Sequence, residues 1–212
     1  MKKDLICFDL DNTLIDSERA HYLSYNSALK KNGFKKVKFE KMVKLFGRPN
    51  NEVVKILTGK NNEEIMEKIH KDHYGFLIRK NYKYAKMLKG VEETLKKLKI
   101  KYNIAVLSNT SHKSILALLK GANLDRKLFD ILVGNDDVRK SKPWPDEIIK
   151  AEKLLDLKAK FMVGDSIYDI IAGKRAKVKT IAVLSGRYSK RQLNEYKPNY
   201  IIRELKGILK II

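Results

Sequence analysis

Six short apolar runs, each closed by a small or polar residue, constrain the fold of this 212-residue chain more than any other feature. Segments with helical periodicity separate these runs from the second run onward. Buried strands of a parallel sheet, joined by crossover helices, produce this pattern. We therefore expect an α/β fold, a Rossmann-like doubly wound parallel sheet that binds ligands at the carboxyl ends of its strands. The expected strands are 4–9, 103–108, 129–133, 160–164, 180–184 and 200–202, and the expected helices are 91–99, 112–120, 146–155 and 168–176.

The stretch 16–87 interrupts this alternation, because it contains helical patterns only. Glycines such as Gly33 and Gly59 divide it, which is typical of turns between short helices. We therefore expect an all-helical domain at 16–87, inserted after the first strand, and a core domain formed by 1–15 and 88–212. A chain of this length that is 43% hydrophobic has room for both.

The formal net charge of +21 first suggests a nucleic-acid-binding protein. Only nine of the 46 basic residues are arginine, however, and the lysines are spread over nearly every expected helix. Such a distribution indicates solvated helix faces and argues against nucleic acid as a partner. The positive charge does favour an anionic substrate.

The apolar segments also bear on the location of the protein. No run approaches the roughly 20 apolar residues of a membrane span, and acidic residues interrupt the first run too early for a secretion signal. The single cysteine, Cys7, excludes an internal disulfide and is expected to be a buried packing residue. We expect a cytoplasmic protein with no membrane partner.

Two pairs of aspartates follow apolar runs that are far apart in the sequence. Asp9 and Asp11 close the first run, and Asp165 and Asp169 follow the run 160–164. Carboxylates this close raise one another's pKa unless a cation or a shared proton compensates, and oxygen ligands are those that Mg²⁺ prefers. The sequence therefore predicts a divalent metal site at the strand ends. Taken alone, Asp169 fits equally well as a negative charge that complements the positive dipole at a helix amino terminus.

Two further segments offer groups that bind phosphate. Ser108 and Asn109 close another run and provide a hydroxyl group and backbone amides beside a helix start. Lys142 precedes a proline-stiffened turn in which Pro145 and Asp146 suit the start of a helix. Each alone has a plainer interpretation, Ser108 as a helix cap and Lys142 as a surface lysine. Combined with the carboxylates, they indicate phosphate chemistry.

Together these segments resemble the four motifs of the haloacid dehalogenase superfamily, in the branch of phosphoglycolate phosphatase and β-phosphoglucomutase. The motifs appear in order as DLDNT at 9–13, LSN at 107–109, KPWP at 142–145 and GDSIYD at 164–169. The resemblance covers nearly the whole chain and implies a phosphatase that uses Mg²⁺ to hydrolyse a small phosphate monoester. It also implies that the helical domain is a cap that closes over the active site.

The resemblance further implies a role for each aspartate of the first and last motifs. Asp9 would be the nucleophile that attacks phosphorus and forms an aspartyl-phosphate. Asp11 would protonate the leaving oxygen and then activate water. The Mg²⁺ ion would be held by Asp9, Asp165 and the main-chain carbonyl of Asp11, with Asp169 acting as a ligand or through water.

The remaining motif residues would bind the substrate. The resemblance implies that Ser108 and Lys142 hold the transferring phosphoryl group, with Lys142 also offsetting the charge of Asp9. Thr13, Asn109 and, on the cap, Arg48 complete the expected substrate-binding set. The histidines share no ligand spacing with carboxylates and are expected to be surface or packing residues; they are His21, His70, His73 and His112.

Other functions remain open at this point. Dehalogenases of the superfamily lack the second carboxylate, so Asp11 favours chemistry at phosphorus. A sugar-phosphate mutase of the β-phosphoglucomutase type would share the core and differ in its cap. A nucleic-acid-binding protein on an inactive fold would have lost catalytic residues, and none is lost. We expect a monomer or weak homodimer. Asn12 and Lys177 stand where glycine is commoner in the family, which concerns loop shape more than chemistry.

Overall fold

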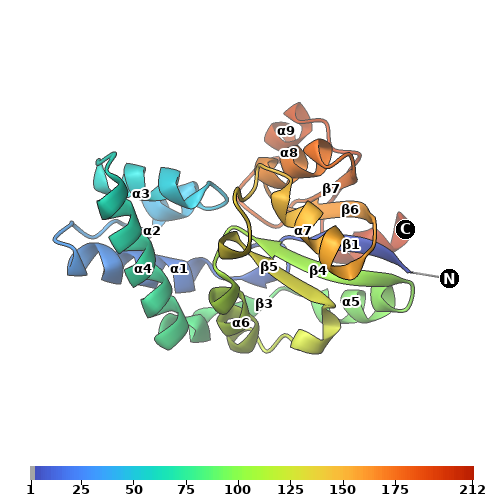
Figure 1. The fold of residues 1–212 in the computed structure, drawn as a ribbon, viewed down its shortest axis with the longest axis horizontal. Helices are drawn as coiled ribbons and strands as arrows, with labels where there is room; N and C mark the ends of the chain where they lie inside the picture. Colours follow the sequence, from blue (N-terminus) through green and yellow to red (C-terminus); the bar gives the residue numbers. More distant parts are fainter. Residues whose placement is uncertain (1–2) are drawn as a thin grey trace.

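A six-stranded parallel sheet forms the centre of the structure, a computed structural model that describes residues 3–212 (Figure 1). The strand order is β5-β4-β1-β6-β7-β8, so the chain builds outward from β1 in both directions. This order is that of a doubly wound sheet, and the expected fold class is confirmed. The strands are β1 Asp4–Phe8, β4 Tyr102–Ser108, β5 Ile131–Gly134, β6 Ala159–Gly164, β7 Lys179–Val183 and β8 Tyr200–Ile202.

Helices cover both faces of this sheet. Alternate residues of β1 point to opposite faces, so Ile6 and Phe8 join one hydrophobic cluster while Leu5 and Cys7 join another. All four side chains are fully buried, which confirms the packing role expected of Cys7. The first cluster includes α5 Val91–Lys99 and α6 His112–Gly121, and the second includes α7 Asp146–Leu155 and α8 Ile167–Arg175. The short α9, Lys190–Glu195, packs near β7 through Leu193.

The helices within residues 18–79 lie to one side of the sheet and have a hydrophobic cluster of their own, which includes Tyr25 and Ile69 (Figure 1). Gly59 ends one of these helices in a left-handed conformation, with φ of 67°. The longest helix among residues 3–212 has 17 residues, and none in that range is long and apolar enough to cross a membrane. The helices are α1 Glu18–Lys31, α2 Phe39–Met42, α3 Asn50–Thr58 and α4 Glu63–Arg79.

A two-stranded antiparallel sheet stands where the chain leaves the core and returns to it. It pairs β2, Ile15–Asp16, with β3, Lys86–Met87. The prediction of helix alone for 16–87 is therefore wrong at both ends of that stretch. Each strand has two residues, too few to show a period, and its partner lies about 70 residues away in the sequence.

Two residues that are not glycine adopt the left-handed backbone conformation that favours glycine. Asn12 has φ of 59° and Lys177 has φ of 58°, both in the left-handed region that side chains with a β-carbon disfavour. Asparagine tolerates this region better than most residues, and Asn12 also donates a hydrogen bond to Glu18 at 3.2 Å. The turn after Asp11 thus keeps its shape without glycine.

Candidate active site

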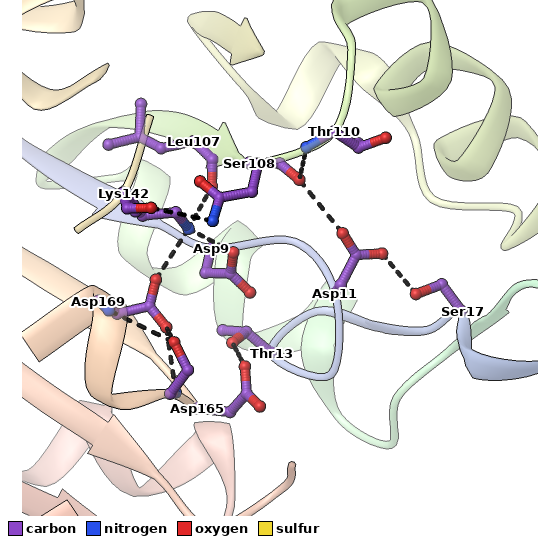
Figure 2. Close-up of polar contacts among 12 residues, drawn as sticks. Asp9, Asp11, Thr13, Ser17, Leu107, Ser108, Thr110, Lys142, Asp165 and Asp169 are labelled. Atoms are coloured by element: carbon purple, nitrogen blue, oxygen red, sulfur yellow. Dashed lines mark hydrogen bonds and ion pairs between the residues drawn. The ribbon is translucent and has the colours of Figure 1, made fainter. Parts of the chain in front are cut away.

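The carboxyl ends of β1, β4 and β6 bring most of the predicted site residues together (Figure 2). Asp9 and Asp11 follow β1, Ser108 ends β4, and Asp165 follows β6. Lys142 reaches the same place from the loop before α7. One pocket between the core and the helical insertion is lined by Asp9, Asp11, Lys142, Asp165 and Asp169, and also by Arg48 and Asn109.

Lys142 connects the two acidic motifs. Its Nζ donates hydrogen bonds to Asp9 Oδ1, to Asp169 Oδ1 at 2.8 Å and to the Leu107 carbonyl oxygen at 3.0 Å, which uses all three ammonium protons. The side chain is 2% exposed. Burial alone would lower the pKa of Lys142, but Asp169 and Asp9 outweigh it and raise that pKa well above its ordinary value. Lys142 is therefore a charged group held in a fixed orientation.

The carboxylates around Lys142 carry more negative charge than one lysine can balance. Burial raises the pKa of Asp9 well above its ordinary value, with Lys142 opposing and Asp169 and Asp165 adding to the rise. Burial, and then Asp169, raise the pKa of Asp165 to about 8. One oxygen from each of Asp9, Asp165 and Asp169 lies within 4.8 Å of the others. This buried oxygen set suits a hard divalent cation, which would relieve the repulsion.

Asp169 combines the two roles that the sequence left open. It belongs to the first turn of α8, where the Ser166 N–H and hydroxyl donate to Asp169 Oδ2 at 3.0 and 2.6 Å. Its other oxygen, Oδ1, accepts from Lys142. The helix cap thus positions the same carboxylate that faces the pocket.

Two glycines leave room for the acidic side chains. A β-carbon at Gly164 would lie 2.2 Å from Asp169 Cγ, and one at Gly186 would lie 1.7 Å from Asp165 Oδ2. Both distances are far below van der Waals contact, so each position requires glycine as long as the carboxylate stays in place. Gly186 follows β7 and was missed in the sequence, because nothing near it indicates a neighbour 21 residues away.

Asp11 lies apart from the acidic cluster and accepts three hydrogen bonds. The donors are Ser17 Oγ, Ser108 Oγ at 3.2 Å and His21 Nε2 at 3.2 Å. Burial would raise the pKa of Asp11, but the contacts with His21, Ser17 and Ser108 outweigh it and hold that pKa below its ordinary value. The structure therefore places His21 in the site, and its assignment as a surface or packing residue is wrong.

Thr13 and Asn109 organise the walls of the site. Thr13 is fully buried, and its hydroxyl donates to Asp165 Oδ1 at 3.2 Å, so it orients a carboxylate. Contact between Thr13 and a substrate stays a prediction. The Asn109 side chain donates to the Lys142 carbonyl oxygen at 3.2 Å, and the Asn109 carbonyl oxygen accepts from Asn50 of α3 at 2.6 Å. Asn109 thus connects the loop that carries Lys142 to the helical insertion.

Arg48 enters the pocket from the insertion. Its guanidinium pairs with Glu52 one helical turn further on, and its Nε is buried without a partner among residues 3–212. Gly47 beside it approaches the core closely, since a β-carbon there would lie 3.3 Å from Tyr188 Cε2 and 3.5 Å from Ser166 Cβ. This loop therefore closes one side of the pocket.

A family model described as haloacid dehalogenase-like hydrolase matches residues 6–183. The chain belongs to this family. A protein of Caldanaerobacter subterraneus subsp. tengcongensis named "Putative pyrophosphatase PpaX" is 34% identical over 215 residues, covering 100% of this chain and 96% of the relative. A pyrophosphatase PpaX of Bacillus mycoides is 29% identical and covers 100% of this chain and 98% of its own length. The crystal structure of a predicted phosphoglycolate phosphatase from Haemophilus somnus has a TM-score of 0.84 and 26% identity, covering 100% of this chain and 98% of that one. The predicted family and hydrolase class are confirmed.

Proposed function

We propose that this protein is a phosphatase that hydrolyses small phosphate esters with Mg²⁺, through an aspartyl-phosphate on Asp9. The observation that carries the proposal is the position of Asp9, which lines the pocket between the Lys142 ammonium and the carboxylates of Asp165 and Asp169. A buried carboxylate that faces a cation and a candidate metal site is a suitable nucleophile for a phosphoryl group.

The first step would transfer the phosphoryl group to Asp9. A carboxylate oxygen of Asp9 forms a bond to phosphorus, and the bond from phosphorus to the ester oxygen breaks. The leaving oxygen takes a proton from Asp11 and departs as an alcohol. Lys142 holds Asp9 in place and offsets the negative charge that gathers in the pocket.

The second step would release phosphate from Asp9. Water attacks phosphorus, its proton passes to Asp11, and the bond between phosphorus and the Asp9 oxygen breaks. The three hydrogen bonds that Asp11 accepts favour its carboxylate form, which is the form that takes this proton. Asp11 would then be ready to act as the acid in the next cycle.

The acidic cluster supplies the donors for the metal. Asp9, Asp165 and Asp169, with the main-chain carbonyl of Asp11, would hold a Mg²⁺ ion that neutralises phosphate charge and lets a carboxylate approach an anion. The fit rests on the donor chemistry, which is buried carboxylate oxygen, and on the raised pKa values that a cation would reverse.

The helical insertion would act as a cap that limits the substrate to small anions. Arg48 lines the pocket with a buried Nε that has no partner among residues 3–212, so it is placed to meet a negatively charged group. The names of the relatives make pyrophosphate and phosphoglycolate the first compounds to test.

The test compares phosphate release from a panel of pyrophosphate, phosphoglycolate and hexose phosphates, with Mg²⁺ and with EDTA. Asp9→Asn should abolish turnover while the circular dichroism spectrum stays that of the wild type. Asp4→Asn is the matched control, because Asp4 lies at the other end of β1 and pairs with Lys160 on the surface. Turnover by Asp9→Asn at the wild-type rate would refute the nucleophile. Isomerisation of a hexose phosphate without phosphate release would indicate a mutase.

A further inference from the structure

A chain of hydrogen bonds runs from α4 of the insertion to Asp11. His73 Nε2 lies 3.1 Å from His21 Nδ1, and His21 Nε2 lies 3.2 Å from Asp11 Oδ1. His21 belongs to α1 and His73 to α4, while Asp11 belongs to the core. The proposed mechanism uses Asp11 but gives His73 no part, although His73 is 1% exposed.

The surroundings of His73 decide which of its nitrogens carries a proton. Burial holds the pKa of His73 well below its ordinary value, so the ring is neutral with a single N–H. Its Nδ1 is buried and has no partner among residues 3–212. An N–H buried without an acceptor is costlier than a bare lone pair, so the proton belongs on Nε2.

The tautomer of His73 then sets that of His21. Because His73 Nε2–H donates, His21 Nδ1 must accept, so the ring proton of His21 stands on Nε2. This nitrogen is the one that faces Asp11 Oδ1, so every donor in the chain points toward the carboxylate. The opposite arrangement would place two lone pairs against each other between His21 and Asp11.

Ring packing holds His73 in the orientation that this arrangement needs. The Tyr25 ring stacks on His73 with centroids 3.8 Å apart and an interplanar angle of 15°. The His21 and His73 rings are also stacked, at 5.2 Å and 23°. A His73 ring turned out of this plane would lose the contact with Tyr25, and a half-turn within the plane would take Nε2 away from His21 Nδ1.

We propose that His73 is a positioning residue, which fixes the tautomer of His21 so that His21 donates to Asp11. This role rests on the proposed function, because Asp11 is the acid and base of that reaction. Since both histidines belong to the insertion, Asp11 receives this donor only while the insertion is docked as it is here. His73 thereby links the position of the insertion to the hydrogen bonding of Asp11, the proposed acid–base group.

Two variants of His73 test the proposal. His73→Phe keeps an aromatic ring for stacking but removes the donor. His73→Gln provides an amide N–H at about the position of Nε2. We expect kcat for phosphate release to fall roughly 10- to 100-fold in His73→Phe, with KM little changed, and to recover most of its value in His73→Gln. Equal kcat in wild type and His73→Phe would overturn the proposal.

A second measurement reads the tautomer without activity. The ¹⁵N chemical shifts of the histidine rings in the full-length wild-type protein should show that His21 carries its proton on Nε2 and none on Nδ1. His112 provides an internal reference, because its Nδ1 donates to Asp137 Oδ2 at 2.9 Å. A His21 that is protonated on Nδ1, alone or as the cation, would also overturn the proposal. A wild type without phosphatase activity refutes the proposed function instead, and the ring shifts still decide the tautomer.

Discussion

Replacement of Gly186 by alanine tests whether the position of Asp165 matters to the chemistry. The new β-carbon would lie 1.7 Å from Asp165 Oδ2, 2.5 Å from Cγ and 2.9 Å from Cβ. Gly186 is not among the glycines with positive φ, so alanine suits the backbone, and the three atoms nearest to the new β-carbon all belong to Asp165. The Asp165 carboxylate must therefore move away, and the backbone must also shift slightly, because rotation of the side chain leaves the Asp165 Cβ at 2.9 Å.

The size of the effect follows from this displacement. Normal contact requires the carboxylate to move by more than about 1 Å, which breaks the hydrogen bond from Thr13 and removes one oxygen from the acidic cluster. A misplacement of this size costs on the order of 100-fold in rate. That factor corresponds to about 2.7 kcal/mol in the activation barrier.

The assay is phosphate release over a range of Mg²⁺ concentrations. We expect kcat/KM of Gly186→Ala to fall on the order of 100-fold, and we expect the Mg²⁺ concentration needed for half-maximal activity to rise. Gly75→Ala is the matched control, because Gly75 lies within α4 with nothing within 4 Å of a new β-carbon. That variant should keep its activity and gain about 0.5–1 kcal/mol in stability. Wild-type kcat/KM in Gly186→Ala at every Mg²⁺ concentration would show that the placement of Asp165 is unimportant.

Two further predictions concern the buried charges. Lys142→Met removes the cation that faces Asp9 and Asp169. We expect urea unfolding in EDTA at pH 8 to show that the free energy of unfolding falls by about 3 kcal/mol, and by less at pH 5, where carboxyl groups gain protons. Equal unfolding midpoints for the wild type and the variant would contradict this. Glu147 is fully buried, and neither of its carboxyl oxygens has a partner among residues 3–212. Burial raises its pKa to about 7, against the opposing effect of Lys142. The folded state therefore holds this proton more tightly than the unfolded state between about pH 4.5 and pH 7, and stability falls as pH rises through that window. Glu147→Gln should thus gain about 3 kcal/mol relative to wild type between pH 4 and pH 8 in EDTA, and a difference independent of pH would refute the assignment.

Much of the site could be predicted from local sequence. Asp9 and Ser108 each close an apolar run and Asp165 follows one, and parallel strands bring their carboxyl ends to one edge of the sheet. Lys142 is different, since a lysine in a chain with 37 lysines carries little information of its own. The motif around it made it a candidate, and the structure buries it between Asp9 and Asp169.

Contacts between distant residues account for what was missed. His21 and His73 are separated by 52 residues, and Gly186 by 21 residues from Asp165. Nothing in the residues beside them indicates these neighbours. The strands β2 and β3 also pair across a long stretch of sequence, and strands of two residues have no period of their own that could indicate them.

The sequence by itself determined where the strands end and which oxygen, hydroxyl and amine groups stand at those ends, because hydrophobic period and turn residues act over a few neighbours. Only the tertiary structure decided how those groups are charged and which nitrogen of each histidine faces its partner. The physical reason is that pKa and tautomer depend on burial and on the nearest charges and hydrogen bonds, and at this site the folded chain brings these from segments far apart in sequence.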